Sequence, residues 1–132
     1  MNALSMLFEA AKAAQARAYV PYSHFPVGAA IRDEVGRIHA APNVENAAYP
    51  AGTCAEAGAI AMMIAGGGRR IAELVVIGNG AQLCTPCGAC RQRIREFAAP
   101  DCAIHIAGPE GVRARFTLDG LLPHSFGPEN LT

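Results

Sequence analysis

Residues 53–78 read TCAEAGAIAMMIAGGGRRIAELVVIG and contain two neighbouring elements of different kinds. Residues 53–65 have the composition of a short, almost wholly apolar helix, and the glycines at 66–68 are too flexible to continue it. Residues 74–78 form a continuous apolar run, which is typical of a strand covered on both faces. A buried helix followed by a doubly covered strand predicts a sheet with helices packed against it.

The same alternation of helices and strands extends towards both ends of the chain. Apolar residues at three- and four-residue steps predict an amphipathic helix over residues 3–18, and Asp33-Glu34-Val35-Gly36 predicts a hairpin turn. The other expected elements are strands over 27–31, 37–41, 102–107 and 112–117, a helix over 88–97, a helical turn over 118–122 and a loop over 43–53. With no repeat or linker, residues 1–132 are expected to form one α/β domain.

Composition excludes several classes of function. The 132 residues carry 11 Lys+Arg against 11 Asp+Glu, and 52% are hydrophobic, so the chain has a core and is not disordered. A formal charge of zero gives no field to attract a polynucleotide, and Arg91, Arg93 and Arg95 are expected to be solvated on a helix face. The longest apolar stretch, residues 57–68, is shorter than the ~20 residues of a membrane span. Because residues 1–20 also lack the composition of a leader, we expect a cytoplasmic protein without membrane contact.

Three of the five cysteines have the spacing of metal ligands. Cys87 and Cys90 form a C-x-x-C pair at the predicted start of one helix, and Cys54 lies at the predicted start of another. The positive ends of two helix dipoles would favour the thiolates, and three thiolates on a tetrahedral Zn²⁺ leave a fourth position open for water. A C-x-x-C pair also occurs in redox motifs, and Cys84 forms a second, overlapping pair that would close the site as a fourth ligand. Cys102, inside an apolar strand, is expected to be an inert core thiol.

Glu56 follows Cys54 by two residues and has two interpretations. Within Thr53-Cys54-Ala55-Glu56 it fits a capping box, in which its carboxylate and the Thr53 hydroxyl bond free N–H groups of the helix. Beside a zinc-bound water, the same carboxylate would shuttle protons to a substrate nitrogen. The order C-x-E followed by P-C-x-x-C is that of zinc deaminases.

Longer motifs extend this pattern over nearly the whole chain. They are YVPYSHFPVGAA at 19–30, NVENAAY at 43–49, CAE at 54–56, PCGACRQ at 86–92 and LLPHSFGPE at 121–129. With these motifs the chain strongly resembles the cytidine deaminases of the small, zinc-dependent, homotetrameric type. The resemblance implies a three-layer α-β-α sandwich around a five-stranded mixed sheet, with one Zn²⁺ per subunit. It also implies hydrolysis of cytidine and 2′-deoxycytidine to uridine or deoxyuridine and ammonia, in pyrimidine salvage.

The resemblance also implies roles for individual residues. Glu56 carries protons between water and the substrate, and the zinc ligands are Cys54, Cys87 and Cys90. The implied substrate-binding groups are the Phe25 and Phe126 rings on the pyrimidine, Asn43 and Glu45 on the ribose hydroxyls, Tyr49 near the 5′ position and the Ala55 N–H on the ring carbonyl. Phe126 and Tyr49 are expected to reach the pocket of a neighbouring subunit. A purely structural interpretation stays open for some of these residues, since Asn43 and Glu45 can organise a loop and either Phe can be a core aromatic.

One position departs from the family pattern. Members of this type often carry Arg directly after the motif Glu, where it donates to the ligand thiolates, but this chain has Ala57. Because three thiolates on Zn²⁺ leave a net charge near −1, we hypothesise that Arg91 donates to them instead. The alternatives to cytidine hydrolysis are a related aminohydrolase for another small amino-heterocycle and a zinc-binding structural module without activity.

Overall fold

The computed structural model describes residues 1–132, which form a five-stranded sheet in the order β2-β1-β3-β4-β5. The strands are β1 (Val27–Asp33), β2 (Ile38–Pro42), β3 (Ile71–Gly78), β4 (Ala98–Gly108) and β5 (Gly111–Thr117). The helices are α1 (Ala3–Gln15), α2 (Ala55–Ala65), α3 (Gly88–Phe97) and α4 (Leu118–Leu121), with 3-10 helices η1 (Tyr49–Ala51) and η2 (Pro128–Leu131). None of these helices has the length and apolar character needed to cross a membrane. Since β3 and β4 are parallel and the other pairs antiparallel, the predicted mixed sheet is confirmed.

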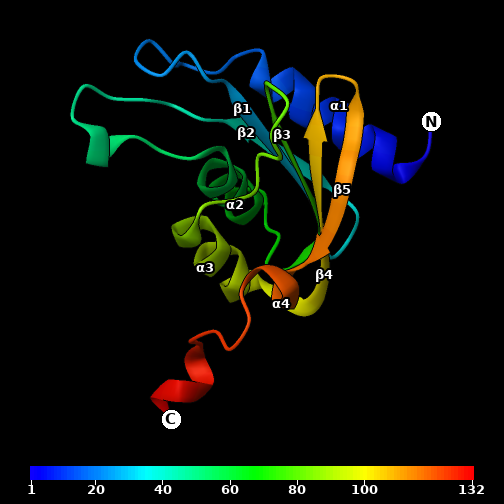
Figure 1. Ribbon diagram of the computed structural model, residues 1–132. Helices are drawn as coiled ribbons and strands as arrows, with labels where there is room; N and C mark the ends of the chain where they lie inside the picture. Colours follow the sequence, from blue (N-terminus) through cyan, green and yellow to red (C-terminus); the bar gives the residue numbers. More distant parts are fainter.

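Helices cover both faces of the sheet, which gives the molecule three layers (Figure 1). On one face α1 packs alone, and its buried Leu7 lies in one cluster with Val75 and Ile77 of β3. On the other face α2, α3 and α4 share a larger cluster with Leu74 and Val76 of the same strand. Successive side chains of a strand point to opposite faces, so the apolar run of β3 serves both layers. The predicted α-β-α sandwich is confirmed.

The contact between α1 and the sheet depends on the glycine at position 28 of β1. A Cβ atom placed on Gly28 would stand 2.1 Å from the carbonyl oxygen of Ala11 and 2.7 Å from the nitrogen of Gln15. Both atoms belong to the backbone of α1, so a larger residue would push the helix away from the sheet. Gly28 therefore fixes how closely α1 approaches the sheet.

The predicted end of α1 at residue 18 was wrong. The helix stops at Gln15, and the N–H groups of Arg17 and Ala18 bond three residues back to form a tight turn. The reason lies in the next residue: Tyr19 donates its N–H to Asn43 and accepts the N–H of Glu45, so the backbone here pairs with a distant loop. Residues 19–26 and 43–53 are thereby held side by side.

Other predicted boundaries differ from the structure by a few residues. β3 begins at Ile71 because Ile71 pairs with Ala98, and β4 consequently starts directly after α3 without a connecting loop. The 3-10 helix η1 lies in the segment that was expected to be a loop, and η2 lies beyond the last predicted element. Each has a proline in its first turn, Pro50 or Pro128, whose fixed φ suits a helical start.

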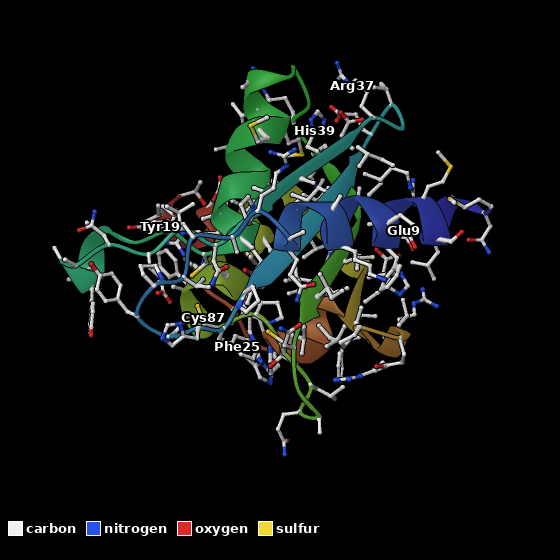
Figure 2. The ribbon with its side chains drawn as sticks, turned by 90° about the horizontal axis from the view of Figure 1, so that it is seen from above. Glu9, Tyr19, Phe25, Arg37, His39 and Cys87 are labelled. Carbon is white, nitrogen blue, oxygen red and sulfur yellow. The ribbon has the colours of Figure 1, made fainter.

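A buried carboxylate ties the β1–β2 turn to the end of α2. The Asp33 side chain accepts N–H bonds from Val35 and Arg37, and its second oxygen lies 2.9 Å from both Arg37 Nε and His39 Nε2. Arg37 in turn donates to the Gly66 carbonyl at 2.8 Å, and Figure 2 shows Arg37 and His39 together at this corner. Burial raises the pKa of Asp33, but the bonds from His39, Arg37 and Val35 outweigh it, so the net pKa lies well below the ordinary value.

We expect Asp33→Asn to destabilise the fold and to weaken its sensitivity to acid. A carboxylate with a depressed pKa contributes stability above its unfolded pKa of about 4, and this contribution is lost as the pH falls through the folded pKa. The thermal midpoint of the variant should therefore lie about 5 °C or more below wild type at pH 7. This difference should shrink as the pH falls from 5 towards 2, as thermal unfolding at several pH values would measure. Asp101→Asn, at an exposed carboxylate, is the matched control; a constant difference for Asp33→Asn at all pH values would contradict the prediction.

Candidate metal centre and substrate pocket

The structure brings three cysteine sulfur atoms together where two helices begin. The Sγ atoms of Cys54, Cys87 and Cys90 all lie within 4.8 Å of one another. Cys54 is the N-cap residue of α2, Cys87 is the N-cap residue of α3, and Cys90 lies in the first turn of α3. The predicted positions of these cysteines at two helix starts are confirmed, and both positive helix ends point towards the cluster.

The donor set fits a zinc ion. With Zn–S bonds of ~2.3 Å, tetrahedral geometry separates neighbouring sulfurs by about 3.8 Å, which lies inside the limit of 4.8 Å found here. Sulfur donors also favour zinc over magnesium or calcium, which take oxygen ligands. Three donors would leave one tetrahedral position free, as in catalytic sites.

The helix starts affect the three thiols differently. The backbone N–H groups of Cys90 and Ala89 at the start of α3 lower the pKa of the Cys87 thiol more than burial raises it. Burial raises the pKa of Cys54 and of Cys90, whose side chain is fully inaccessible. Cys87 is thus the thiol that most readily ionises, and a cation is needed to hold the other two as thiolates.

Glu56 is buried beside the thiols and does not cap the helix. Its side chain is only 5% exposed, and its negative charge raises the pKa of Cys54, Cys84 and Cys90. The capping-box interpretation was wrong, because the N-cap of α2 is Cys54, without a side-chain cap bond. Thr53 instead exchanges backbone hydrogen bonds with Val44. Burial raises the pKa of the Glu56 carboxyl. The backbone N–H of Glu56 and the charge of Arg93 offset part of this increase.

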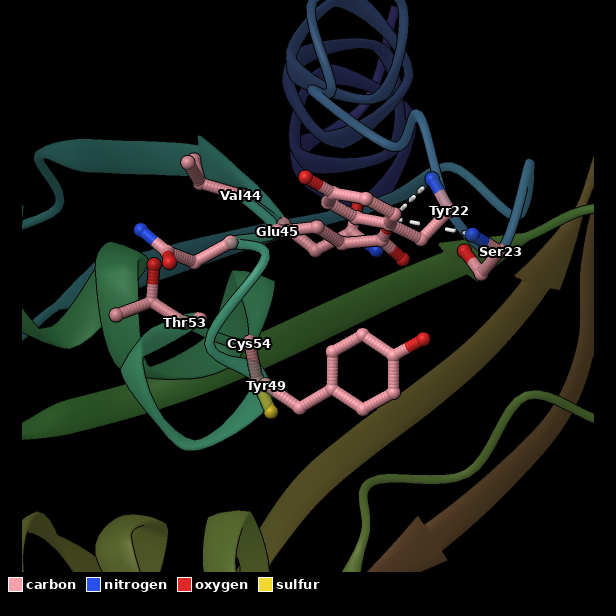
Figure 3. Close-up of a pocket in the computed structure, with 10 residues that line it drawn as sticks. Tyr22, Ser23, Val44, Glu45, Tyr49, Thr53 and Cys54 are labelled. Atoms are coloured by element: carbon pink, nitrogen blue, oxygen red, sulfur yellow. Dashed lines mark hydrogen bonds between the residues drawn. The ribbon is translucent and has the colours of Figure 1, made fainter.

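A cavity of about 480 Å³ opens beside the cluster, and Cys54 forms part of its wall. Figure 3 shows it between the two loops that Tyr19 joins, with Glu45 on one side and Tyr49 on the other. Its walls come from these loops and from the start of α2: Tyr22, Ser23, Asn43, Val44, Glu45, Asn46, Tyr49, Gly52, Thr53 and Cys54. A volume of this size is typical of sites for small molecules.

Asn43 and Glu45 both line this cavity and also organise its loops. The Asn43 amide accepts the N–H of Val27 at 2.9 Å and donates to the carbonyl of Phe25 at 3.1 Å. One oxygen of Glu45 accepts the N–H groups of Tyr22 and Ser23, and bonds from Ser23 and Tyr22 hold the pKa of Glu45 below its ordinary value. The loop-organising interpretation is confirmed for both residues, and their place in the cavity wall leaves the binding role open to them.

The other predicted substrate residues are spread around the centre. Ala55 is fully buried at the first position of α2, where its N–H has no partner within the helix. Phe25 lies over the end of β3 beside Cys84, within 3.2 Å of the Cβ that a residue at position 78 would carry. Tyr49 lines the cavity of its own chain, 6.1 Å from the Tyr22 ring, and remains 77% exposed. Phe126 does not line the cavity and is 56% exposed.

Of the three arginines of α3, Arg93 is exposed as expected, whereas Arg91 and Arg95 are half-buried, and Arg91 does not reach the thiols. Its guanidinium donates to the Pro86 and Leu121 carbonyls, at 2.7 and 2.8 Å, and to the Thr85 hydroxyl. The hypothesis that Arg91 donates to the thiolates was therefore wrong. Arg93 makes that contact instead, because Nη1 of Arg93 donates to the Sγ of Cys90 at 3.4 Å.

Two further results bear on the cysteines and on Arg95. Cys84 lies outside the three-sulfur cluster and packs on the main core, so its overlapping C-x-x-C does not supply a fourth donor. Cys102 is buried in β4, where burial raises the pKa of its thiol to about 11, consistent with the inert thiol predicted for this position. Arg95 bonds Ser125 and Glu129 and thereby holds the C-terminal segment on α3.

Comparisons with known proteins agree with this geometry. The family described as "Cytidine and deoxycytidylate deaminase zinc-binding region" matches residues 1–106. The chain is 39% identical over 126 residues to the cytidine deaminase of Sporosarcina psychrophila, covering 96% of this chain and 93% of that protein. It is 42% identical over 128 residues to the cytidine deaminase of Mycobacterium tuberculosis H37Rv, covering 96% and 92%. The crystal structure of cytidine deaminase from Burkholderia pseudomallei superposes with a TM-score of 0.86 at 39% identity, covering 92% of this chain and 98% of that chain.

Proposed function

The chain belongs to the cytidine and deoxycytidylate deaminase family, and from this premise we propose that it hydrolyses cytidine, and 2′-deoxycytidine, to the uracil nucleoside and ammonia. The observation that carries the proposal is the position of Cys54, which belongs both to the three-sulfur cluster and to the cavity wall. A nucleoside in this cavity has its base next to the metal centre and its ribose between the loops. The two alternatives were an aminohydrolase for another amino-heterocycle and a zinc-binding structural module without activity. Neither is favoured, because the relatives are themselves cytidine deaminases.

The reaction needs a group that moves protons, and we assign that role to Glu56. Cys54, Cys87 and Cys90 would hold a zinc ion, which would act as a Lewis acid and make water a nucleophile near neutral pH. The Glu56 carboxylate accepts a proton from the attacking water and delivers it to N3 of the pyrimidine. It then transfers a second proton from the new hydroxyl at C4 to the departing amino group, which leaves as ammonia. Its burial supports the role, because the carboxylate is shielded from bulk water beside the thiols.

Substrate orientation follows from the residues around the cavity. Asn43 and Glu45 bind the ribose hydroxyls, and their own hydrogen bonds to residues 22–27 hold them rigidly. The N–H of Ala55 donates to the pyrimidine carbonyl at the start of α2. Phe25 packs on the base, Tyr49 lies near the 5′ position, and Phe126 completes the pocket from a neighbouring subunit.

The function is tested by ammonia release and uridine formation from cytidine with zinc-replete protein. A panel with 2′-deoxycytidine, cytosine and other amino-heterocycles measures the specificity. Stoichiometric uridine and ammonia support the proposal. A protein that binds zinc but turns over none of the cytidine nucleosides would overturn it.

Glu45→Gln is expected to raise the KM for cytidine about tenfold or more while kcat changes much less. The amide keeps one oxygen for the N–H groups of Tyr22 and Ser23 but loses the charge that strengthens bonds to the ribose hydroxyls. Steady-state kinetics measure the effect. Glu9→Gln, which removes the same charge from the exposed side of α1, is the control (Figure 2); an unchanged KM in Glu45→Gln would argue against the ribose contact.

The proposal includes a homotetramer that acts in the cytoplasm in pyrimidine salvage. The accessible surface of the single chain, 7052 Å², exceeds the ~6,600 Å² expected for a monomer of this size. Large apolar side chains are exposed, including Tyr49 and Phe126, and Figure 1 shows the C-terminal segment extending away from the sheet. Subunit contacts would cover these residues. Five free thiols suit a reducing compartment such as the cytoplasm.

A further inference from the structure

A second cavity lies between α2 and α3, the two helices that begin at the thiol cluster. It has a volume of about 440 Å³, and its walls include Ala57 and Ile60 of α2 and Gln92, Arg93 and Glu96 of α3. Arg93 lies on the exposed side of this cavity, and its guanidinium extends to the fully buried sulfur of Cys90. The Arg93 side chain therefore connects the wall of this cavity with the sulfur of Cys90.

The centre needs positive charge from its surroundings. Three thiolates leave a Zn²⁺ complex with a net charge near −1, and the buried carboxylate of Glu56 adds to the negative charge beside it. The two helix starts offset only part of this charge. Arg91 and Arg95 are engaged with other groups, and Arg93 is the arginine within hydrogen-bond distance of a thiol.

Helix geometry explains why Arg93 makes this contact. Residues three apart in a helix share a face, so Arg93 stands over Cys90, whereas the adjacent Arg91 points to another side. On α2, position 57 follows Glu56 directly and faces the same cavity, and in this chain it holds only the methyl group of alanine. The guanidinium in the space between α2 and α3 is thus supplied by Arg93 of α3.

We propose that Arg93 is the positioning residue of the metal centre, which holds the Cys90 thiolate and neutralises the ligand charge from α3 because Ala57 cannot do so from α2. This inference rests on the zinc site of the proposed function. Without Arg93 the ligand thiolates carry uncompensated charge and Cys90 loses its donor, so the site holds zinc less firmly. The same loss reduces kcat more than KM, because Arg93 lies behind the ligands and does not line the substrate cavity.

The test measures zinc release to a chromogenic chelator in the absence of substrate. Arg93→Gln should release zinc about tenfold or more faster than wild type, and its Co²⁺-substituted form should show a shifted sulfur-to-metal absorption band. Arg93→Lys keeps the charge but loses the planar set of N–H donors, so its rate of zinc release should lie between those of wild type and Arg93→Gln. The double variant Ala57→Arg with Arg93→Gln returns a guanidinium to the same cavity and should restore a release rate close to wild type.

Arg115→Gln is the matched control. Arg115 is exposed on β5, makes no side-chain hydrogen bond, and is in register with His105 and Val75 on the α1 face of the sheet. A wild-type release rate and cobalt spectrum in Arg93→Gln would overturn the inference, as would equal acceleration in Arg115→Gln. Because no substrate is present, these results are independent of cytidine turnover; a wild-type protein that bound no zinc would instead contradict the proposed function.

Discussion

Replacing Glu56 with glutamine is expected to reduce kcat for cytidine by about 10³-fold while the protein keeps its zinc and its fold. The amide has nearly the same shape, but it cannot accept a proton from water or return one to N3 and the leaving amino group. Since no side-chain cap bond at the start of α2 involves Glu56, the helix loses no cap. Because burial raises the pKa of the Glu56 carboxyl and so disfavours its charged form, the neutral amide should also leave the thermal midpoint unchanged or slightly raised.

Three measurements on the same preparation test this expectation: zinc content, thermal unfolding, and turnover at saturating cytidine. Glu9→Gln is the matched control, because Glu9 is an exposed residue of α1, on the other face of the sheet, without a hydrogen-bond partner. It should retain nearly full turnover. Near wild-type turnover in a zinc-loaded Glu56→Gln protein would remove Glu56 from the mechanism, whereas loss of zinc would show that the carboxylate supports the metal instead.

The layered architecture and the positions of the three cysteines could be predicted because local signals decide them. The apolar run of residues 74–78 required cover on both faces, and α1 on one side with α2 and α3 on the other provide it. Cys54, Cys87 and Cys90 stand at helix starts that glycine, proline and apolar composition indicate. A local pattern was sufficient for the single elements, whereas the five-stranded sandwich and the meeting of Cys54 with Cys87 and Cys90 followed from the family resemblance.

Interactions between distant segments could not be predicted in the same way. Thr53 and Glu56 match a capping box, but backbone pairing of Thr53 with Val44 leaves Cys54 as the N-cap. Arg91 is engaged by carbonyls as far away in sequence as Leu121, which no local pattern announces. The contact of Arg93 with Cys90 was different, because their three-residue separation on a predicted helix already placed them on one face.

Removal of the exposed ligand Cys87 is expected to weaken zinc binding by at least about 100-fold and to abolish turnover. Loss of a hydrogen-bond partner of a ligand typically costs 10- to 100-fold in affinity, and loss of a ligand itself costs more. Cys87→Ala is a sensitive choice, because Cys87 has the thiol with the lowered pKa and its side chain makes no cap bond to α3. The fold itself should survive, since the cluster of Leu74, Val76 and Ile94 does not include Cys87.

Cys84→Ala gives the decisive comparison, because Cys84 and Cys87 are the two ends of one C-x-x-C and lie on the same loop. Cys84 packs on the core outside the sulfur cluster, so its removal should lower the thermal midpoint while zinc content and turnover are kept. Chelator titrations should then separate the two variants. Added chelator should lower the thermal midpoint of wild type and of Cys84→Ala, because it removes zinc that stabilises their folded state. It should leave the thermal midpoint of Cys87→Ala unchanged, because that variant holds no zinc to lose. The opposite pattern, zinc retained without Cys87 and lost without Cys84, would move the ligand to the other end of the motif. The centre would then need a different arrangement of the loop before α3.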